Sequence, residues 1–296
     1  IKRKTRMDHS AIKGCLEDQG YCVIPGIISS EDIDYCKTLH SDWVAGIPNH
    51  DKFHSTFDPH GIYKHHRAGH TQYAWHIRTH PNVQEVFHNL WETEELVVSF
   101  DGSCYIPKEC QRKDNIWTHT DQGAKTHELT CYQGFVSMTD NKERTLVVYE
   151  GSHKLHEEYF KERGITSHKN WNKIDLDYLE KIGDKKRVLE VPAGSLVLWD
   201  SRTFHQNQYG SKECCEERLV QYVSYLPKNA PGNTKAMTGK RLKYFREQRT
   251  TSHWAYPISV NGLQPRTWGN TELEIDYDAL PMTDLSDMEE DIMKII

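Results

Sequence analysis

The stretch Pro192-Ala-Gly-Ser-Leu-Val-Leu-Trp-Asp-Ser-Arg-Thr-Phe-His205 decides how this chain folds. It opens with a turn signal, Pro192-Ala-Gly194, and continues with a short apolar run from Ser195 to Trp199. Such a run has the length of a buried β-strand. The polar residues that follow end in His205, so a strand of this kind in a barrel can bring that histidine to an interior site.

Similar short strands on both sides of this stretch predict a β-rich core. They are expected at Val98 to Ile106, Leu129 to Thr139, Thr145 to Tyr149, Arg187 to Val191 and Leu219 to Leu226. Turn signals such as Asp140-Asn141 and Glu150-Gly151 separate most of them. Many short strands with such turns predict a sandwich or barrel.

Helical patterns lie before and within this core. Residues 10 to 19 are expected to form a helix, Tyr21 to Ile24 a strand, and the residues after Ser29 or Ser30 a second, capped helix. Helical spacing returns from Pro81 to Leu90, and a helical insertion is expected from about Leu155 to Glu180.

In two further segments, the apolar residues follow neither helical nor strand spacing. Residues 49 to 80 hold eight of the eighteen histidines and read as a long irregular region, which is usually functional in a compact domain. Residues 284 to 296 form an acidic tail that either is loosely held or packs as a short helix. We predict one domain over residues 1–283, with its β core at about 96–227.

Composition excludes several classes of function. The chain has 296 residues and a formal net charge of -6, so it has no global positive field to attract nucleic acid or an anionic membrane. It has no apolar run of the ~20 residues that cross a bilayer, and its first residues do not predict a secretory leader. Eight cysteines without a CxxC pair suit reduced thiols in an intracellular, cytoplasmic protein.

The first candidate for chemistry is Trp117-Thr-His-Thr-Asp121. Residues two apart on a strand point to the same face, so His119 and Asp121 can reach one ion together. The HxD pattern alone occurs often by chance, and a structural role is then the better interpretation.

His205 strengthens the interpretation of His119 and Asp121 as metal ligands. Two histidines and one carboxylate occupy one face of an octahedron and leave three positions open, which is diagnostic of non-haem Fe(II) oxygenases. A catalytic zinc site with the same ligands, His119, Asp121 and His205, remains an alternative.

Arg218 begins the strand that follows His205. Its guanidinium can form a two-pronged bond with the distal carboxylate of a dicarboxylic cosubstrate. The alternative is a surface ion pair with Glu216 or Glu217.

With these pieces in place, the chain resembles the phytanoyl-CoA dioxygenase family of Fe(II)- and 2-oxoglutarate-dependent oxygenases. The resemblance covers roughly residues 10 to 227 in the family's order, and it rests on Gln19-Gly-Tyr-Cys-Val-Ile-Pro-Gly26, Trp117-Thr-His-Thr-Asp121, the segment 140–154 with Glu150-Gly-Ser-His-Lys154, and Gly194 to His205.

The resemblance implies a mainly β protein with flanking helices, built on a double-stranded β-helix, the cupin-like jelly roll. It implies that His119, Asp121 and His205 bind Fe(II) and that Arg218 binds 2-oxoglutarate, with O2 as oxidant and ascorbate as a stimulant. Further contacts to 2-oxoglutarate are expected from three residues: Asn207, Tyr105 and Gln133. On a strand, Asp101, Ser103 and Tyr105 alternate with their neighbours and would therefore share one polar face.

The expected reaction is hydroxylation of an unactivated C–H bond of a small molecule, with release of succinate and CO2. Asp121 is intact where halogenating relatives carry a small residue, so hydroxylation is favoured over halogenation. Two alternatives stay open: a jelly roll that binds a ligand or a protein without catalysis, and a zinc hydrolase.

Other patterns have plainer explanations. Ser152 in Gly151-Ser-His-Lys154 lacks the surroundings of a nucleophile and reads as a capping turn. The histidines of residues 50–80 lack metal-ligand spacing and favour a polar loop over a second metal site. The basic run Gly239 to Arg249 reads as a solvated helix face, and Cys214-Cys215 as free thiols.

Overall fold

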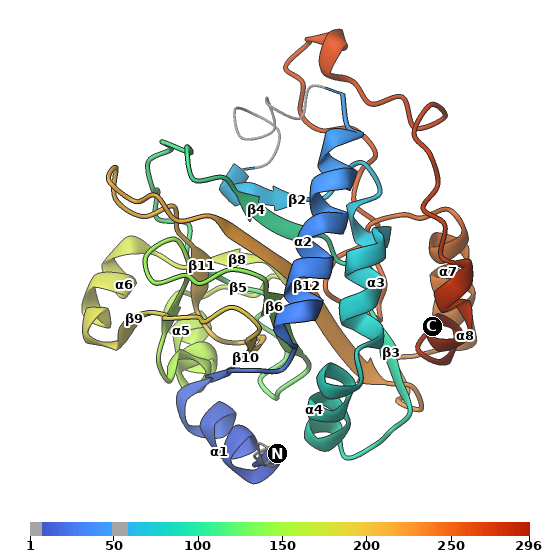
Figure 1. Ribbon diagram of the computed structural model, residues 1–296. Helices are drawn as coiled ribbons and strands as arrows, with labels where there is room; N and C mark the ends of the chain where they lie inside the picture. Colours follow the sequence, from blue (N-terminus) through green and yellow to red (C-terminus); the bar gives the residue numbers. More distant parts are fainter. Residues whose placement is uncertain (1–7, 49–58) are drawn as a thin grey trace, which may run out of the picture.

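A computed structural model describes residues 8–48 and 59–296 of the chain. Two antiparallel sheets form its centre (Figure 1). The larger sheet has the order β1 (Tyr21–Ile24), β10 (Leu196–Asp200), β6 (Tyr132–Ser137), β12 (Arg218–Pro227), β4 (Ser103–Ile106) and β2 (Ile62–Tyr63), and β3 (Leu96–Val98) pairs with β12. The smaller sheet has the order β8 (Asn172–Lys173), β5 (His119–Thr120), β11 (His205–Asn207), β7 (Leu146–Tyr149) and β9 (Lys186–Val188). The predicted two-sheet β core is confirmed.

The central strands are buried along their whole length. Every position of β6, β7 and β10 is buried. Such strands read as continuous apolar runs rather than alternating patterns, because both faces of the strand are covered. This explains why Ser195 to Trp199 was recognisable as a strand from its sequence alone.

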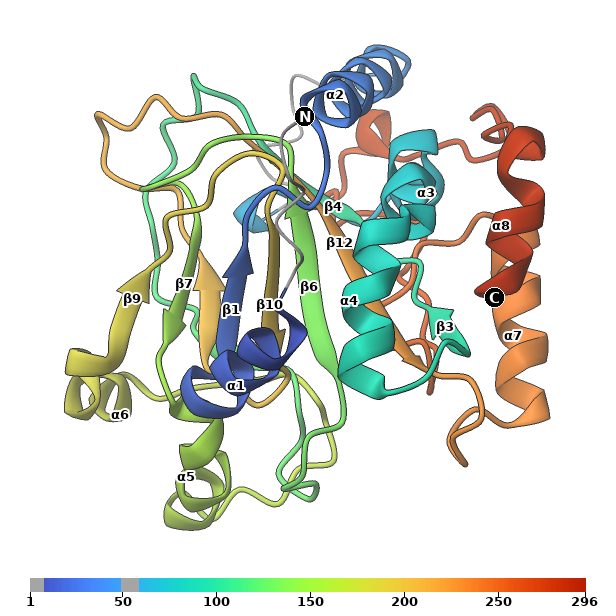
Figure 2. The ribbon, with the colours of Figure 1, turned by 60° about the horizontal axis from the view of Figure 1, so that its bottom comes forward.

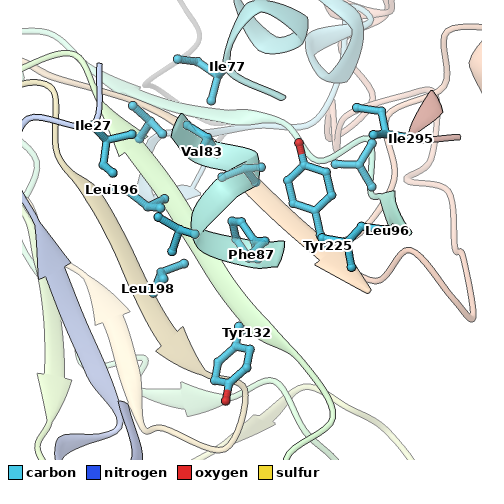
Figure 3. Close-up of a cluster of buried hydrophobic side chains, with 14 of the residues drawn as sticks. Ile27, Ile77, Val83, Phe87, Leu96, Tyr132, Leu196, Leu198, Tyr225 and Ile295 are labelled. Carbon is cyan, nitrogen blue, oxygen red and sulfur yellow. The ribbon is translucent and has the colours of Figure 1, made fainter. Parts of the chain in front are cut away.

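Helices cover the outer face of the larger sheet. They are α1 (His9–Gln19), α2 (Ser30–Ala45), α3 (Gln72–Thr79) and α4 (Pro81–Trp91) (Figure 2). Val83 and Phe87 of α4 are buried in one cluster with Leu196 and Leu198 of β10 and Tyr225 of β12 (Figure 3). The predicted helix from Pro81 to Leu90 is thus confirmed, and its apolar stripe is what attaches it to the sheet.

The second helix begins as expected. Ser29 accepts a hydrogen bond from the backbone N–H of Asp32, and Asp32 accepts one from the backbone N–H of Ser29. This capping box satisfies two N–H groups that the helix itself leaves unpaired.

The irregular region was predicted too broadly. Residues 49–58 lie outside the described residues, but Gln72–Thr79 form α3, with Tyr73, Trp75 and Ile77 buried. This short helix was not recognised within the histidine-rich segment. Thr71 caps it by accepting a hydrogen bond from Ala74 N–H.

The prediction of one strand from Val98 to Ile106 was also wrong. Residues 99–102 separate β3 from β4, and they bring Gly102 against β2. A Cβ on Gly102 would lie 1.8 Å from the carbonyl oxygen of Tyr63. The absence of a side chain is therefore a condition of this close backbone approach.

The end of the chain packs on the same core. Beyond α7 (Lys235–Arg246), the acidic tail contains α8 (Glu289–Lys294), and Ile292, Ile295 and Ile296 are buried in the cluster that holds α4. The backbone N–H of Val98 donates to the carbonyl of Ile295 over 2.9 Å. Of the two alternatives for the tail, the packed helix is the one observed.

The insertion between β7 and β9 holds α5 (His156–Glu162), β8 and α6 (Leu176–Lys181). Short 3-10 helices complete the fold at Pro59–Gly61, Ala68–His70, Ser152–Leu155, Gly183–Lys185, Thr271–Leu273 and Ser286–Met288. Within residues 8–48 and 59–296, no helix is both long and apolar enough to cross a membrane.

Candidate metal centre

His119, Asp121 and His205 lie together between the two sheets. Each offers one ligand atom, and the three atoms lie within 4.8 Å of one another. Asp121 Oδ2 is 3.5 Å from His119 Nε2 and 3.3 Å from His205 Nε2. The cluster forms because β5 and β11 are neighbours in the smaller sheet, with His119 directly opposite His205.

Both imidazoles are oriented by main-chain carbonyls. His119 Nδ1 lies 3.2 Å from the carbonyl oxygen of Trp117, and His205 Nδ1 lies 2.9 Å from that of Thr203. A carbonyl oxygen only accepts, so each Nδ1 carries the proton and donates it. Each Nε2 is then left with a lone pair that is free to bind a metal, as metal-binding histidines require.

The charge states suit a divalent metal. Burial lowers the pKa of His119, which favours the neutral imidazole. Burial alone would raise the pKa of Asp121, but the neighbouring His119 holds it well below its ordinary value of 3.8. Metal ligands must be deprotonated in this way.

The spacing also fits one ion. With metal–ligand bonds of about 2.1 Å, ligands at right angles are about 3.0 Å apart. The separations of 3.3 and 3.5 Å are close to that value. Three protein ligands from one side leave room on the other side for a cosubstrate.

A cavity of about 290 Å³ adjoins the cluster. Its lining is aromatic in part, with Trp117, Trp171, Trp199 and Tyr222, and polar in part, with Lys64, Asp101, Gln133, Asn207, Thr251, Ser252, His253 and Asn261. Ile62 and Leu146 complete it. The three candidate ligands form part of the same lining, so a molecule in the cavity can reach the metal position.

Gln133 and Asn207 both line the cavity. Gln133 Nε2 donates to Asp121 Oδ2 over 3.0 Å, while its Oε1 is buried without a hydrogen-bond partner among the described residues. Asn207 Nδ2 donates to the hydroxyl of Tyr222 over 3.0 Å.

Arg218 is 1% exposed at the start of β12. Its Nη1 contacts the sulfur of Cys104 at 3.4 Å, and its Nη2 is buried without a hydrogen-bond partner among the described residues. Cys104 also lies 3.9 Å from Asn207 Nδ2, so Arg218 is close to the cavity although it is not one of the lining residues. An anion that accepts a hydrogen bond from the unpaired N–H group would stabilise this buried guanidinium.

The alternative explanation of Arg218, a surface ion pair, is wrong. The Glu216 carboxylate accepts hydrogen bonds from the backbone N–H groups of residues 142–144 instead. Glu217 accepts from the hydroxyl of Tyr105 over 3.4 Å. Neither acid forms an ion pair with Arg218 among the described residues.

Tyr105 is not brought to the cavity. Its ring lies 4.6 Å from that of His40 of α2, on the helix-covered side of the larger sheet. Because residues 99–102 are not part of a strand, alternation does not carry from Asp101 to Ser103 and Tyr105. Cys104 takes the inward position instead, and Asp101 alone of the three lines the cavity.

His253 is a lining residue that sequence reasoning missed. It follows α7, its Nε2 is buried without a hydrogen-bond partner among the described residues, and burial lowers its pKa. One histidine among eighteen, outside any motif, gave no signal. Trp171, in the insertion, was missed for the same reason.

The remaining sequence candidates have structural roles. Ser152 Oγ accepts a hydrogen bond from the backbone N–H of Phe204 over 2.8 Å, so it stabilises a turn but does not cap a helix. Among the described residues, the histidines before His80 take part in no metal-binding group. In the basic run, Arg241 is buried and donates to the carbonyl of Ala255. Cys214 and Cys215 are free thiols.

The model of the phytanoyl-CoA dioxygenase (PhyH) family matches residues 16–208. The chain belongs to this family. The matched range includes all three candidate ligands and Asn207, whereas Arg218 and His253 lie beyond it. The resemblance seen in the motifs is confirmed.

Individual proteins are similar at lower identity. A curated relative, "Ava biosynthesis cluster protein O" of Aspergillus versicolor, is 28% identical over 233 residues, which cover 71% of this chain and 75% of that protein. The epimerase SnoN, solved with Fe3+, alpha ketoglutarate and nogalamycin RO, has a TM-score of 0.52 at 17% identity and covers 74% of this chain and 83% of its own. EctD of S. alaskensis, solved with 2-oxoglutarate and 5-hydroxyectoine, has a TM-score of 0.52 at 13% identity and covers 77% and 78%. The protein has the fold of these enzymes, the predicted jelly roll with flanking helices.

Proposed function

We propose that the protein is an Fe(II)- and 2-oxoglutarate-dependent dioxygenase that hydroxylates a C–H bond of a small molecule and releases succinate and CO2. The observation that carries this proposal is the cluster of His119, Asp121 and His205, in which both Nε2 atoms lie within 3.5 Å of Asp121 Oδ2. Family membership supports it, as do the iron and alpha ketoglutarate bound by SnoN and the 2-oxoglutarate bound by EctD.

The three ligands would hold the iron, and bound iron with 2-oxoglutarate supplies the oxidative chemistry. Asp121 keeps its negative charge because its pKa is held well below its ordinary value, so the carboxylate can bind a cation. Gln133 fixes the orientation of that carboxylate by donating to Oδ2. These residues hold the site in position before any substrate enters.

Arg218 is proposed to bind the distal carboxylate of 2-oxoglutarate. Its unpaired Nη2 supports this role, since a carboxylate supplies the missing acceptor with opposite charge. Asn207 and Gln133 are proposed as further hydrogen-bonding contacts. Tyr105 lies on the other side of the sheet and is not proposed to contact 2-oxoglutarate.

The aromatic part of the lining excludes water from the reacting C–H bond. Trp117 is held by a hydrogen bond from its Nε1 to the carbonyl of Asn207, and its ring stacks against His119 at 4.8 Å. A dry, fixed wall next to the metal position favours attack on the substrate over side reactions with solvent.

The test is succinate release from 2-oxoglutarate with Fe(II) and O2. We expect wild-type protein to release succinate and His119→Ala, Asp121→Ala and His205→Ala to release none. His127→Ala, in which an exposed histidine is removed, should keep full turnover. Unchanged turnover in all three ligand variants would overturn the assignment.

The same assay separates the alternatives. A binding module releases no succinate in any form, and a zinc hydrolase is active with zinc and indifferent to 2-oxoglutarate. SnoN is an epimerase, so the substrate-derived product decides between hydroxylation and epimerisation. A product heavier by one oxygen atom supports hydroxylation.

A further inference from the structure

Trp171 stands out among the tryptophans because it combines exposure with a place in the cavity. Its side chain is 52% exposed, and it lines the cavity that contains the three candidate ligands. Trp268 is also exposed, at 78%, but it does not line this cavity. Trp171 is therefore the exposed indole that a molecule at the metal centre would meet.

The position of the Trp171 ring is fixed by the sheet. The next residue begins β8, in which Asn172 is opposite Thr120 and Lys173 opposite His119 of β5. The ring centroid of Trp171 lies 5.4 Å from that of His119, with 29° between the ring planes. The insertion between β7 and β9, whose strand β8 lies next to β5 (Figure 1), thus places a flat apolar surface beside His119.

The exposed face of the Trp171 ring offers apolar surface to a ligand. Exposed apolar surface is unfavourable in water, and aromatic rings gain additional energy by stacking with other rings. His119 also stacks with Trp117, which in turn stacks with His60 at 3.7 Å. The stack of flat rings ends at Trp171, where a ligand ring can continue it.

A polar part of the lining comes from the segment after α7. Thr251 is anchored there because its N–H donates to the carbonyl of Phe100 and its carbonyl accepts from Asn261 Nδ2. This anchoring places His253 in the lining, and its buried Nε2 has no hydrogen-bond partner among the described residues. A buried polar atom that faces a cavity needs a partner from whatever fills that cavity.

We propose that the substrate is a planar, conjugated ring system that stacks on Trp171 and carries a hydrogen-bonding group for His253 Nε2. This inference rests on the proposed function, because it names the substrate class of the same site. Fused aromatic rings gain stacking energy on a flat indole beyond the area that they bury, whereas aliphatic chains and compact saturated metabolites gain only the burial.

The test uses two pairs of probes, with zinc in place of iron and with 2-oxoglutarate present, so that no turnover occurs. The first pair, 2-naphthamide and decahydro-2-naphthamide, has the same amide but differs in planarity. The second pair, 2-naphthamide and naphthalene, has the same ring system but differs in the polar group. Binding is measured by ligand-observed NMR titration.

Wild-type protein should bind 2-naphthamide about three to ten times more tightly than its saturated analogue, the range expected for one aromatic pair. Trp171→Ala should remove this preference, Trp171→Phe should keep most of it, and Trp268→Ala should not change it. His253→Phe should remove the preference for the amide over naphthalene and leave the preference for planarity. Equal binding of the first pair to wild type, or an unchanged preference in Trp171→Ala, would overturn the proposal.

The outcome is independent of the proposed reaction. Planar preference through Trp171 in a protein that releases no succinate would support this inference and overturn the proposed function. Succinate release by a protein without planar preference would support the proposed function and overturn the inference about the substrate. Uptake of zinc by each variant, measured in parallel, shows that the site is folded.

Discussion

Gln133 Nε2 donates a hydrogen bond of 3.0 Å to Asp121 Oδ2, the same oxygen that lies 3.3 Å from His205 Nε2. Gln133 belongs to β6 of the larger sheet, whereas Asp121 directly follows β5 of the smaller one. The bond therefore crosses between the sheets and orients the carboxylate from the opposite wall.

Gln133→Leu should weaken metal binding without removing a ligand. Loss of an outer hydrogen bond to a metal ligand typically costs about 10- to 100-fold in affinity. The dissociation constant for Fe(II) or Mn(II), measured by competition with a chelator under anaerobic conditions, checks this. Gln248→Leu is the matched control, because Gln248 is also buried but bonds to Thr283. Equal affinities in wild type and Gln133→Leu would show that the bond has no effect on the metal.

Arg218→Met should act on the cosubstrate. A hydrogen bond to a charged group contributes about 1.5–3 kcal/mol, so the KM for 2-oxoglutarate should rise by roughly 10- to 150-fold while metal affinity stays the same. Arg218→Lys should recover part of the lost affinity for 2-oxoglutarate, since lysine restores the positive charge but not the two-pronged hydrogen bond of a guanidinium. Arg187→Met, at a half-exposed arginine that pairs with Glu150, should leave the KM unchanged. An unaltered KM in Arg218→Met would assign the guanidinium a purely structural role.

Gly102→Ala should destabilise the fold. The added Cβ would lie 1.8 Å from the carbonyl oxygen of Tyr63, so the backbone of β2 or β4 must move, at a cost of about 1–3 kcal/mol or more. The control is Gly14→Ala in the exposed part of α1, where no atom lies within 4 Å of the new Cβ. That change should stabilise the protein by about 0.5–1 kcal/mol. Midpoints of urea unfolding measure both, and shifts of the same sign would contradict the prediction.

Stability should fall in mild acid, in part through His40. Burial lowers the pKa of this histidine to about 4, whereas its ordinary value is 6.5. Between these values the unfolded chain binds a proton that the folded chain does not, so stability is present above pH 6.5 and is lost progressively towards pH 4. At pH 5 the loss from this one residue is about 2 kcal/mol.

His40→Phe should therefore reduce the loss of stability between pH 7.5 and pH 5 by about 2 kcal/mol. The replacement ring can occupy the place between Tyr73 and Tyr105, which flank His40 at 5.6 and 4.6 Å. Urea unfolding at the two pH values gives the difference, and the exposed His127→Ala should leave it unchanged. An equal loss in wild type and His40→Phe would exclude His40 as a source of acid sensitivity.

The sequence predicted best what depends on neighbouring residues. Tyr21 to Ile24 and Ser195 to Trp199 were recognisable because an apolar run between two turn signals is a complete description of a buried strand, and they correspond to β1 and β10. The spacing of His119 and Asp121 likewise follows from strand geometry alone. The partnership with His205 was inferred from the apolar strand before it, which in a barrel can bring that histidine opposite the HxD pair.

What escaped prediction depends on contacts between distant segments. The break before β4, which turns Tyr105 away from the cavity, follows from the approach of Gly102 to Tyr63. Trp171 reaches the cavity only because β8 pairs with β5, and His253 only because the segment after α7 returns to the sheet. None of these contacts leaves a local pattern in the sequence.

The carbonyls of Trp117 and Thr203 orient the imidazoles of the two candidate ligands, His119 and His205, and every residue has such a carbonyl. Replacement of either side chain therefore leaves the orienting group in place. Under the proposed function, substitutions in the insertion or after α7 are therefore expected to change the choice of substrate without changing the orientation of the candidate metal ligands. For protein engineers, these two segments are the natural places to randomise in a library.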